Sequence, residues 1–203
     1  MNKKIVHDAL ILTAFTLALG LILGFVYEIT KTPIEKANEE AAKEAYQTVF
    51  KDADSFTPQE FDKEEANKLV SEAGFSDTID DIELAADKSG NPLGYVITVT
   101  AKDASQASIT FSVGIKNDGT VNGYSITDIA ETPGLGMKAE EEEFYSQFEG
   151  KNVSEFTVVK QAPSAENEIE AITGSTITSK AMANGCNAAI YYFQNALGGA
   201  GNE

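Results

Sequence analysis

The stretch Gly94–Ile129, GYVITVTAKDASQASITFSVGIKNDGTVNGYSITDI, decides the fold class. It contains three segments rich in Ile, Val, Thr, Phe and Tyr, residue types that favour strands, and small polar residues separate them. Asp118-Gly119, between the last two segments, is typical of a tight hairpin turn. The spacing therefore predicts a run of antiparallel strands. The strands expected here and just upstream are Ile79–Ala86, Gly94–Ala101, Ser108–Lys116 and Val121–Ile129.

Helical patterns flank these strands on both sides. Strands and helices are thus segregated along the chain, which favours an α+β domain with a mainly antiparallel sheet and flanking helices over a doubly wound sheet. The other elements expected are helices over Ile34–Phe50 and Lys63–Ala73, a helical segment around Glu140–Phe148, a strand at Glu155–Lys160, and a long helix from Thr176 to Leu197 closed by Gly198-Gly199.

An apolar segment precedes the domain. Ala9–Tyr27 carries no charged residue, and at about 1.5 Å per residue it is close to the ~30 Å of a bilayer's hydrocarbon core. A cleaved signal peptide is the alternative, but the run exceeds the roughly 7–15 residues of a signal core and no small-x-small site follows it. The segment is therefore expected to stay as a single membrane anchor, with Lys3 and Lys4 on the cytoplasmic side.

These patterns give a domain organisation. Pro33 disfavours helical geometry at Thr32, so we expect the anchor helix to end there. The expected parts are a cytoplasmic N-terminus over residues 1–8, a transmembrane helix over 9–27, an amphipathic connecting helix and linker over 28–62, and an extracytoplasmic domain over 63–203.

Charge and cysteine content exclude some functions. The chain has 15 Lys and Arg residues, none of them Arg, against 32 Asp and Glu residues, for a net charge of −17. Such a chain repels nucleic acid. The single cysteine, Cys186, cannot form an internal disulfide, and its place on the apolar side of the last predicted helix favours a buried small side chain over a redox thiol.

Five hydroxyl side chains crowd into Thr173–Ser179, TGSTITS, immediately before the last predicted helix. Two uses of such a cluster remain open from spacing alone. Hydroxyls can cap the free N–H groups of a helix start, with Thr176 and Ser179 or Ser175 and Thr178 as the pairs. Alternatively, the helix start can hold a phosphate, and an exposed hydroxyl there can carry it covalently.

A second loop, Glu131–Gly136 (ETPGLG), matches part of a dinucleotide-binding pattern. Gly134, Gly136 and Ala139 satisfy G-x-G-x-x-A, but the loop follows an antiparallel strand and no second βαβ unit is present. The sequence therefore favours either a tight glycine turn or a loop whose small residues let a flat ligand approach the backbone.

The anchor followed by TKTPIEKAN, ETPGLGMK and TGSTITSKAMANG resembles the G subunits of Rnf (Rsx) ion-translocating ferredoxin:NAD oxidoreductases. The same FMN-binding domain occurs in the C subunit of the sodium-translocating NADH:quinone reductase. In this family a flavin transferase attaches FMN through its phosphate to a threonine in D-x-x-[ST]-G-A-[ST]. The matching segment is Glu170–Thr176, with Glu in place of Asp at 170 and Ser in place of Ala at 175. The resemblance thus implies a phosphoester between FMN and Thr176.

The resemblance also implies a set of site residues. Leu135 is expected against a face of the isoalloxazine ring, Lys138 near the phosphate or reduced flavin, and Thr178 and Ser179 either on the phosphate or capping the helix. The implied FMN-binding residues are Glu131, Thr132, Gly134, Leu135, Gly136, Lys138, Thr173, Gly174, Ser175, Thr176, Ile177, Thr178 and Ser179.

The function implied is electron relay within a multi-subunit membrane translocase whose other subunits carry iron–sulfur clusters, flavins and the nicotinamide site. The sequence shows no nucleophile–base pair and no metal site, and its only histidine, His7, lies at the foot of the anchor, so we expect no independent turnover. Two alternatives remain: an anchored extracytoplasmic flavoprotein outside that complex, and a non-redox binding module.

Overall fold

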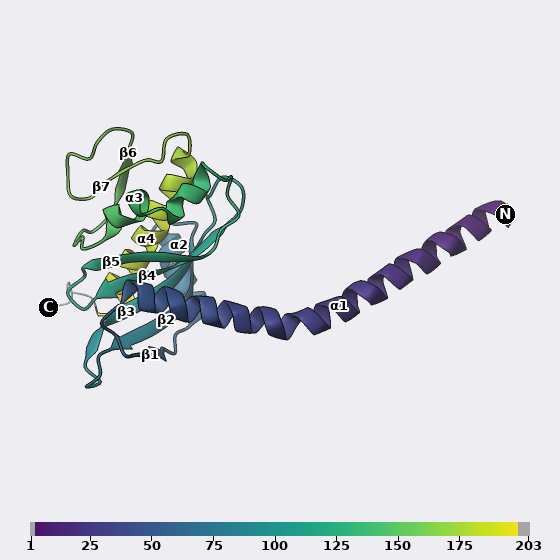
Figure 1. The fold of residues 1–203 in the computed structure, drawn as a ribbon, viewed down its shortest axis with the longest axis horizontal. Coiled ribbons are helices and arrows are strands. Elements are labelled where there is room, and N and C mark those ends of the chain that lie inside the picture. Colours follow the sequence, from purple (N-terminus) through teal and green to yellow (C-terminus); the bar gives the residue numbers. More distant parts are fainter. Residues whose placement is uncertain (1–2, 199–203) are drawn as a thin grey trace. The chain divides into compact units, whose positions relative to one another are not determined.

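The computed structural model describes residues 3–198 of the 203-residue chain and divides it into two compact units, residues 1–41 and 42–203 (Figure 1). The first unit is helical and belongs to α1, which spans Lys3–Val49 and continues into the second unit. Among the described residues, α1 is the one helix long and apolar enough to cross a membrane, and its large apolar side chains from Leu10 to Ile34 are exposed.

The predicted break at Pro33 is wrong, because α1 runs through this residue without interruption. A proline inside a helix removes one backbone hydrogen bond and crowds the preceding turn. Strong helix formers follow it, in the stretch EKANEEAAKEA, and these favour continuation of the helix. The connecting segment is therefore helical through Val49 as part of α1 and does not form a separate helix.

A five-stranded antiparallel sheet is the centre of the second unit. The strands are β1 (Ser55–Pro58), β2 (Thr78–Ala86), β3 (Pro92–Ala101), β4 (Ile109–Lys116) and β5 (Val121–Asp128), and they lie in chain order. The predicted strands and the α+β class are confirmed. Within this sheet, only the edge strand β1 was not expected, since it is short and ends in a proline.

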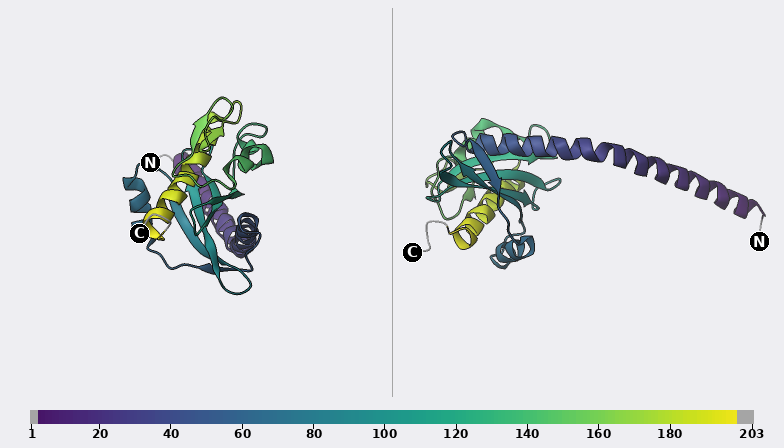
Figure 2. Two further views of the ribbon diagram at one scale, coloured as in Figure 1. Left: turned by 90° about the vertical axis from the view of Figure 1, so that its left-hand side faces the viewer. Right: turned by 90° about the horizontal axis from the view of Figure 1, so that it is seen from below.

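One face of the sheet is covered by α4 (Thr176–Ala196) and α2 (Lys63–Glu72), as Figure 2 shows for α4. Gly185 lets α4 lie close to the sheet, since a Cβ there would come within 2.5 Å of the Phe111 ring. Cys186 is fully buried on this face, as predicted, and burial raises the pKa of its thiol. On the opposite face, Tyr46, Val49 and Phe50 pack against Ala85 and Val96.

Short elements between the sheet and α4 complete the unit. They are η1 (Gly136–Glu140), α3 (Glu142–Tyr145), η2 (Ser146–Phe148), and the strands β6 (Thr157–Val159) and β7 (Glu168–Glu170). β6 and β7 pair in parallel, and five residues separate β7 from α4. The segment that enters α4 is therefore held at both ends by regular structure.

Candidate functional site

Three loops meet at the N-terminus of α4 and enclose a pocket of about 350 Å³, which we call the helix-start pocket. The loops are Lys102–Ser108 between β3 and β4, Glu131–Gly136 after β5, and Thr173–Ser175 before α4. A volume of this size is within the range of small-ligand sites. The lining residues are Ser105, Gln106, Glu131, Thr132, Leu135, Gly136, Gly174, Ser175, Thr176 and Ile177.

The start of α4 offers free donors to this pocket. Ser175 is the N-cap residue, but its side chain makes no capping hydrogen bond. Within residues 3–198, no acceptor is present for the backbone N–H groups of Thr176, Ile177 and Thr178. Unpartnered N–H groups at the positive end of a helix dipole bind anions, phosphate included.

Three of the five hydroxyls in the cluster are hydrogen-bonded within the described chain, and two are not. Ser175 Oγ and Thr178 Oγ1 are hydrogen-bonded at 2.8 Å. Ser179 Oγ accepts from Ile172 N at 2.9 Å and donates to the Ser175 carbonyl oxygen at 2.9 Å. All three side chains are buried. Their hydrogen bonds fasten the turn before α4.

The other two hydroxyls, those of Thr173 and Thr176, have no hydrogen-bond partner in the described chain. They differ in location, because Thr176 lines the helix-start pocket whereas Thr173 lines a different pocket. Thr176 is therefore the one hydroxyl of this cluster that lines the helix-start pocket and has no partner in the described chain.

The Glu131 carboxylate, on the ETPGLG loop, hydrogen-bonds both the loop between β3 and β4 and the first turn of α4. The carboxylate is buried, and Oε1 accepts from the Ser105 N–H at 2.7 Å and from the Gln106 N–H at 3.0 Å. Oε2 accepts from Thr178 Oγ1 at 3.3 Å. Gly136 makes this placement possible, since a Cβ at that position would overlap the carboxylate.

Two exposed apolar side chains border the pocket. Among the described residues outside α1, Leu135 at 42 % and Ile177 at 59 % are the large hydrophobic side chains that stay exposed. Leu135 lies over Gly174, because a Cβ on that glycine would be 3.2 Å from Leu135 Cδ2. An apolar pair beside a polar helix start suits a ligand with a flat ring at one end and an anion at the other.

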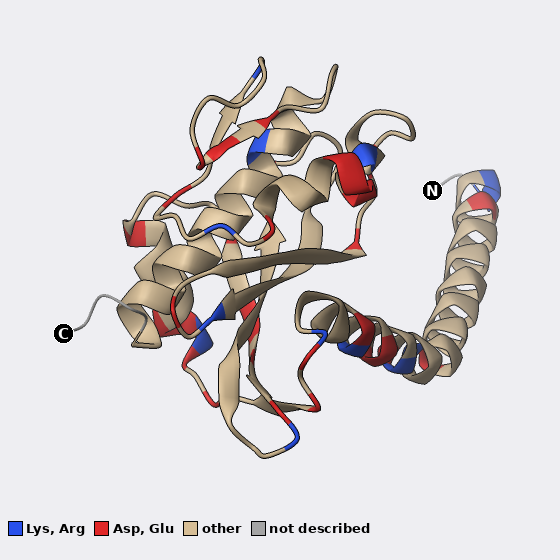
Figure 3. Cartoon of the chain, turned by 60° about the vertical axis from the view of Figure 1, so that its left-hand side comes forward, with Lys and Arg blue, Asp and Glu red and all other residues tan. Residues whose placement is uncertain are grey.

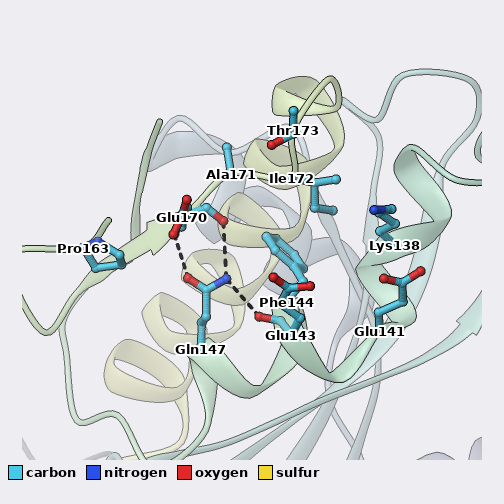
Figure 4. Close-up of a pocket in the computed structure, with 10 residues that line it drawn as sticks. All are labelled: Lys138, Glu141, Glu143, Phe144, Gln147, Pro163, Glu170, Ala171, Ile172 and Thr173. Atoms are coloured by element: carbon cyan, nitrogen blue, oxygen red, sulfur yellow. Dashed lines mark hydrogen bonds between the residues drawn. The ribbon is translucent and has the colours of Figure 1, made fainter. Parts of the chain in front are cut away.

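A second pocket of about 420 Å³ contains the remaining predicted residues Lys138 and Thr173 (Figure 4). One side is held by Gln147, which accepts from Glu170 N at 2.7 Å and donates to the Glu170 carbonyl oxygen at 3.3 Å. The structure thus places Lys138 in this second pocket, apart from the residues that line the helix-start pocket.

Gly134 lies on a loop of the helix-start pocket but does not line the pocket. Gly134 is exposed at the tip of its loop with φ +76°, a conformation that glycine adopts readily. Sequence reasoning missed Ser105 and Gln106, which reach the site through their backbone N–H groups. The available signal was the unusually long polar connection KDASQAS between two strand patterns.

Comparison with known proteins agrees with this geometry. The FMN-binding domain family matches residues 106–191, which include the loops of Glu131 and Thr176, and the RnfG N-terminal region matches residues 1–49. The G subunit of the Na⁺-translocating ferredoxin:NAD⁺ oxidoreductase complex of Acetobacterium woodii is 34% identical over 196 residues, covering 95% of this chain and 93% of that protein. The chain belongs to the RnfG family.

Other relatives extend the RnfG comparison. The G subunit of the proton-translocating ferredoxin:NAD⁺ oxidoreductase complex of Clostridium ljungdahlii is 31% identical over 180 residues, covering 89% of this chain and 86% of that protein. The crystal structure of the C subunit of Na⁺-translocating NADH-quinone reductase from Parabacteroides distasonis shares the fold, with a TM-score of 0.53 and 18% identity over 79% of this chain and 94% of that one.

Proposed function

We propose that this RnfG-family chain relays electrons in an ion-translocating ferredoxin:NAD oxidoreductase complex through FMN joined to Thr176 as a phosphoester. The observation that carries the proposal is the state of Thr176: its hydroxyl is uncommitted, it lines the helix-start pocket, and it begins a helix whose first N–H groups have no acceptor in the described chain.

The residues present fit FMN. The N–H groups of Thr176, Ile177 and Thr178 are donors for phosphate oxygens, and the helix dipole favours the negative charge there. Leu135 and Ile177 offer apolar contact to a flat ring. Bound FMN supplies one- and two-electron chemistry, which the side chains of this domain do not supply themselves.

The division of the hydroxyls gives each a role in this site. Ser175, Thr178 and Ser179 fasten the turn that presents Thr176, because their hydroxyls are bonded to one another, to Glu131 or to the backbone. Thr173 lies outside the pocket. Lys138 also lies outside it, so we assign phosphate binding to the backbone N–H groups instead of this lysine.

The wider setting follows from the anchor and the family. The apolar part of α1 anchors the chain in the cell membrane, and we place Lys3 and Lys4 on the cytoplasmic side and the second unit outside. A flavin transferase attaches the FMN. The electron-transfer partners are other membrane, iron–sulfur and flavin subunits of the complex.

Intact mass spectrometry tests the proposal. The full chain is coexpressed with a flavin transferase as wild type, Thr176→Val and Thr173→Ser, the last being a control that changes the other free hydroxyl residue but keeps a side chain that the transferase motif accepts. Wild type and Thr173→Ser gain the mass of FMN minus water, and Thr176→Val gains nothing. A modified Thr176→Val chain, or an unmodified wild type where a control acceptor is modified, contradicts the assignment.

A further inference from the structure

Glu131 is the one titratable side chain among the residues that line the helix-start pocket in the described chain. It is 6 % exposed, so its charge is shielded from water far more than that of a surface glutamate. Its three hydrogen-bond partners are two backbone N–H groups and a threonine hydroxyl. N–H groups can only donate, so Glu131 Oε1 is the acceptor in both of these bonds.

We infer that Glu131 is a positioning residue with two effects: it joins the three loops of the pocket, and it places a fixed negative charge beside the flavin that lowers the flavin's reduction potential. The second effect rests on the proposed function, whereas the first does not require a bound flavin.

The joining effect follows from chain distances. Ser105 and Gln106 lie 26 and 25 residues from Glu131 along the chain, and Thr178 lies 47 residues away. One carboxylate therefore connects a hairpin loop, the ETPGLG loop and the first turn of α4. Without it, the Ser105 and Gln106 N–H groups lose their acceptor, and the wall of the pocket that they form is no longer held.

The electrostatic effect follows from the sign of the charge. Reduction adds electrons to the ring system, and a negative charge held nearby opposes that addition. The buried position makes the opposition stronger than that of a solvated carboxylate at the same distance. The nearby exposed residues Glu141 and Glu143, in the second pocket, lack this shielding.

The substitution Glu131→Gln separates charge from shape. Glutamine keeps an acceptor oxygen for the two N–H groups and removes the charge, whereas Glu131→Ala removes both. Glu141→Gln is the matched control, because it removes one exposed negative charge from the second pocket.

Two measurements test the two effects. In the full chain without flavin, as Thr176→Val, amide hydrogen exchange at Ser105 and Gln106 is expected to accelerate at least tenfold with Glu131→Ala and to stay near the parent rate with Glu131→Gln. In the flavin-loaded chain, Glu131→Gln is expected to raise the ratio of reduced to oxidised flavin at a fixed potential about tenfold, which is 29.6 mV for a two-electron couple. Glu141→Gln is expected to change it much less.

Each effect has its own contrary result. Unchanged exchange in Glu131→Ala overturns the joining role, and equal potentials for wild type, Glu131→Gln and Glu141→Gln overturn the electrostatic role. A chain that never acquires flavin is a failure of the proposed function instead, and the exchange measurement still decides the joining role.

Discussion

The second unit buries carboxylates in two ways. Glu131, at the site, is surrounded by donors, whereas Asp77 and one oxygen of Glu83, on the scaffold, are buried with no hydrogen-bond partner in the described chain. Burial without donors disfavours the ionised form of a carboxyl group. The difference separates a carboxylate whose oxygens have donors from carboxyl oxygens that are buried without them.

The scaffold carboxylates show the cost of burial in their pKa values. Burial, helped by the neighbouring Asp103, raises the pKa of Asp77 to about 6. Burial and the nearby Asp81 raise the pKa of Glu83 to about 7. Tyr46 donates a hydrogen bond to Asp81, and burial followed by the charge of Asp81 raises the pKa of Tyr46 to about 12.

The largest effect on stability is expected from Glu131→Ala. This change leaves two N–H groups and the Thr178 hydroxyl without their acceptor, at a cost of about 2–3 kcal/mol in the free energy of unfolding. Urea denaturation of the full chain in detergent, followed by near-UV circular dichroism of the tyrosines, measures it. A loss below about 0.5 kcal/mol, the range of ordinary surface changes, would contradict a stabilising role for the hydrogen bonds of Glu131.

Asp77→Asn is expected to act in the opposite direction. The folded state holds the proton on Asp77 more tightly than the unfolded state, because its pKa rises from 3.8 to about 6. This contribution to stability is therefore full below about pH 4 and is lost as the pH rises through 6. At pH 7.5 the asparagine variant is expected to gain about 1–2 kcal/mol over wild type, and at pH 4 no gain is expected. An equal gain at both pH values would contradict titration of Asp77 as the cause.

Glu83→Gln tests the second scaffold carboxyl, whose contribution to stability is lost at a slightly higher pH. With a pKa raised from 4.5 to about 7, the contribution of Glu83 is lost between about pH 4.5 and 7, slightly above the window of Asp77. The glutamine variant is expected to flatten the fall in unfolding free energy between pH 6 and 7.5 by about 1 kcal/mol. Urea denaturation midpoints between pH 6 and 7.5 measure this change. If the slope of unfolding free energy against pH is the same in wild type and variant, a group other than Glu83 takes up the proton.

The smallest effect is expected from Glu141→Gln. Glu141 is exposed and belongs to the run of glutamates Glu140–Glu143, and Figure 3 marks acidic residues in red along the backbone. Its neutralisation is expected to change the unfolding free energy by less than about 0.5 kcal/mol at any pH between 5 and 8. A larger change would mean that exposure alone does not distinguish these carboxylates from Glu131.

Much of the scaffold could be predicted because its signals are local. The strand patterns from Ile79 to Ile129 and the long final helix are confirmed, since alternation and turn residues lie within each segment. The helix break at Pro33 was wrong because strong helix formers on the far side favour continuation. β7 was missed because its three residues, Glu168–Glu170, are too few to show a strand pattern.

The candidate site was predictable only in part, for a similar reason. The resemblance indicated the ETPGLG loop and the start of α4, and the structure brings Leu135, Gly136 and Thr176 to one pocket. It does not bring Lys138 there. The contribution of Ser105 and Gln106 depends on a carboxylate 26 and 25 residues away, respectively, which no local pattern could indicate.

Peptide mapping decides which hydroxyl carries the flavin. Trypsin cleavage after Lys160 and Lys180 of the flavin-loaded full chain releases the peptide of residues 161–180, which contains both free hydroxyls, Thr173 and Thr176. Fragment-ion mass spectrometry then assigns the modified residue. We expect FMN phosphate on Thr176 and an unmodified Thr173. FMN on Thr173, or on a residue outside this peptide, would contradict the proposed linkage.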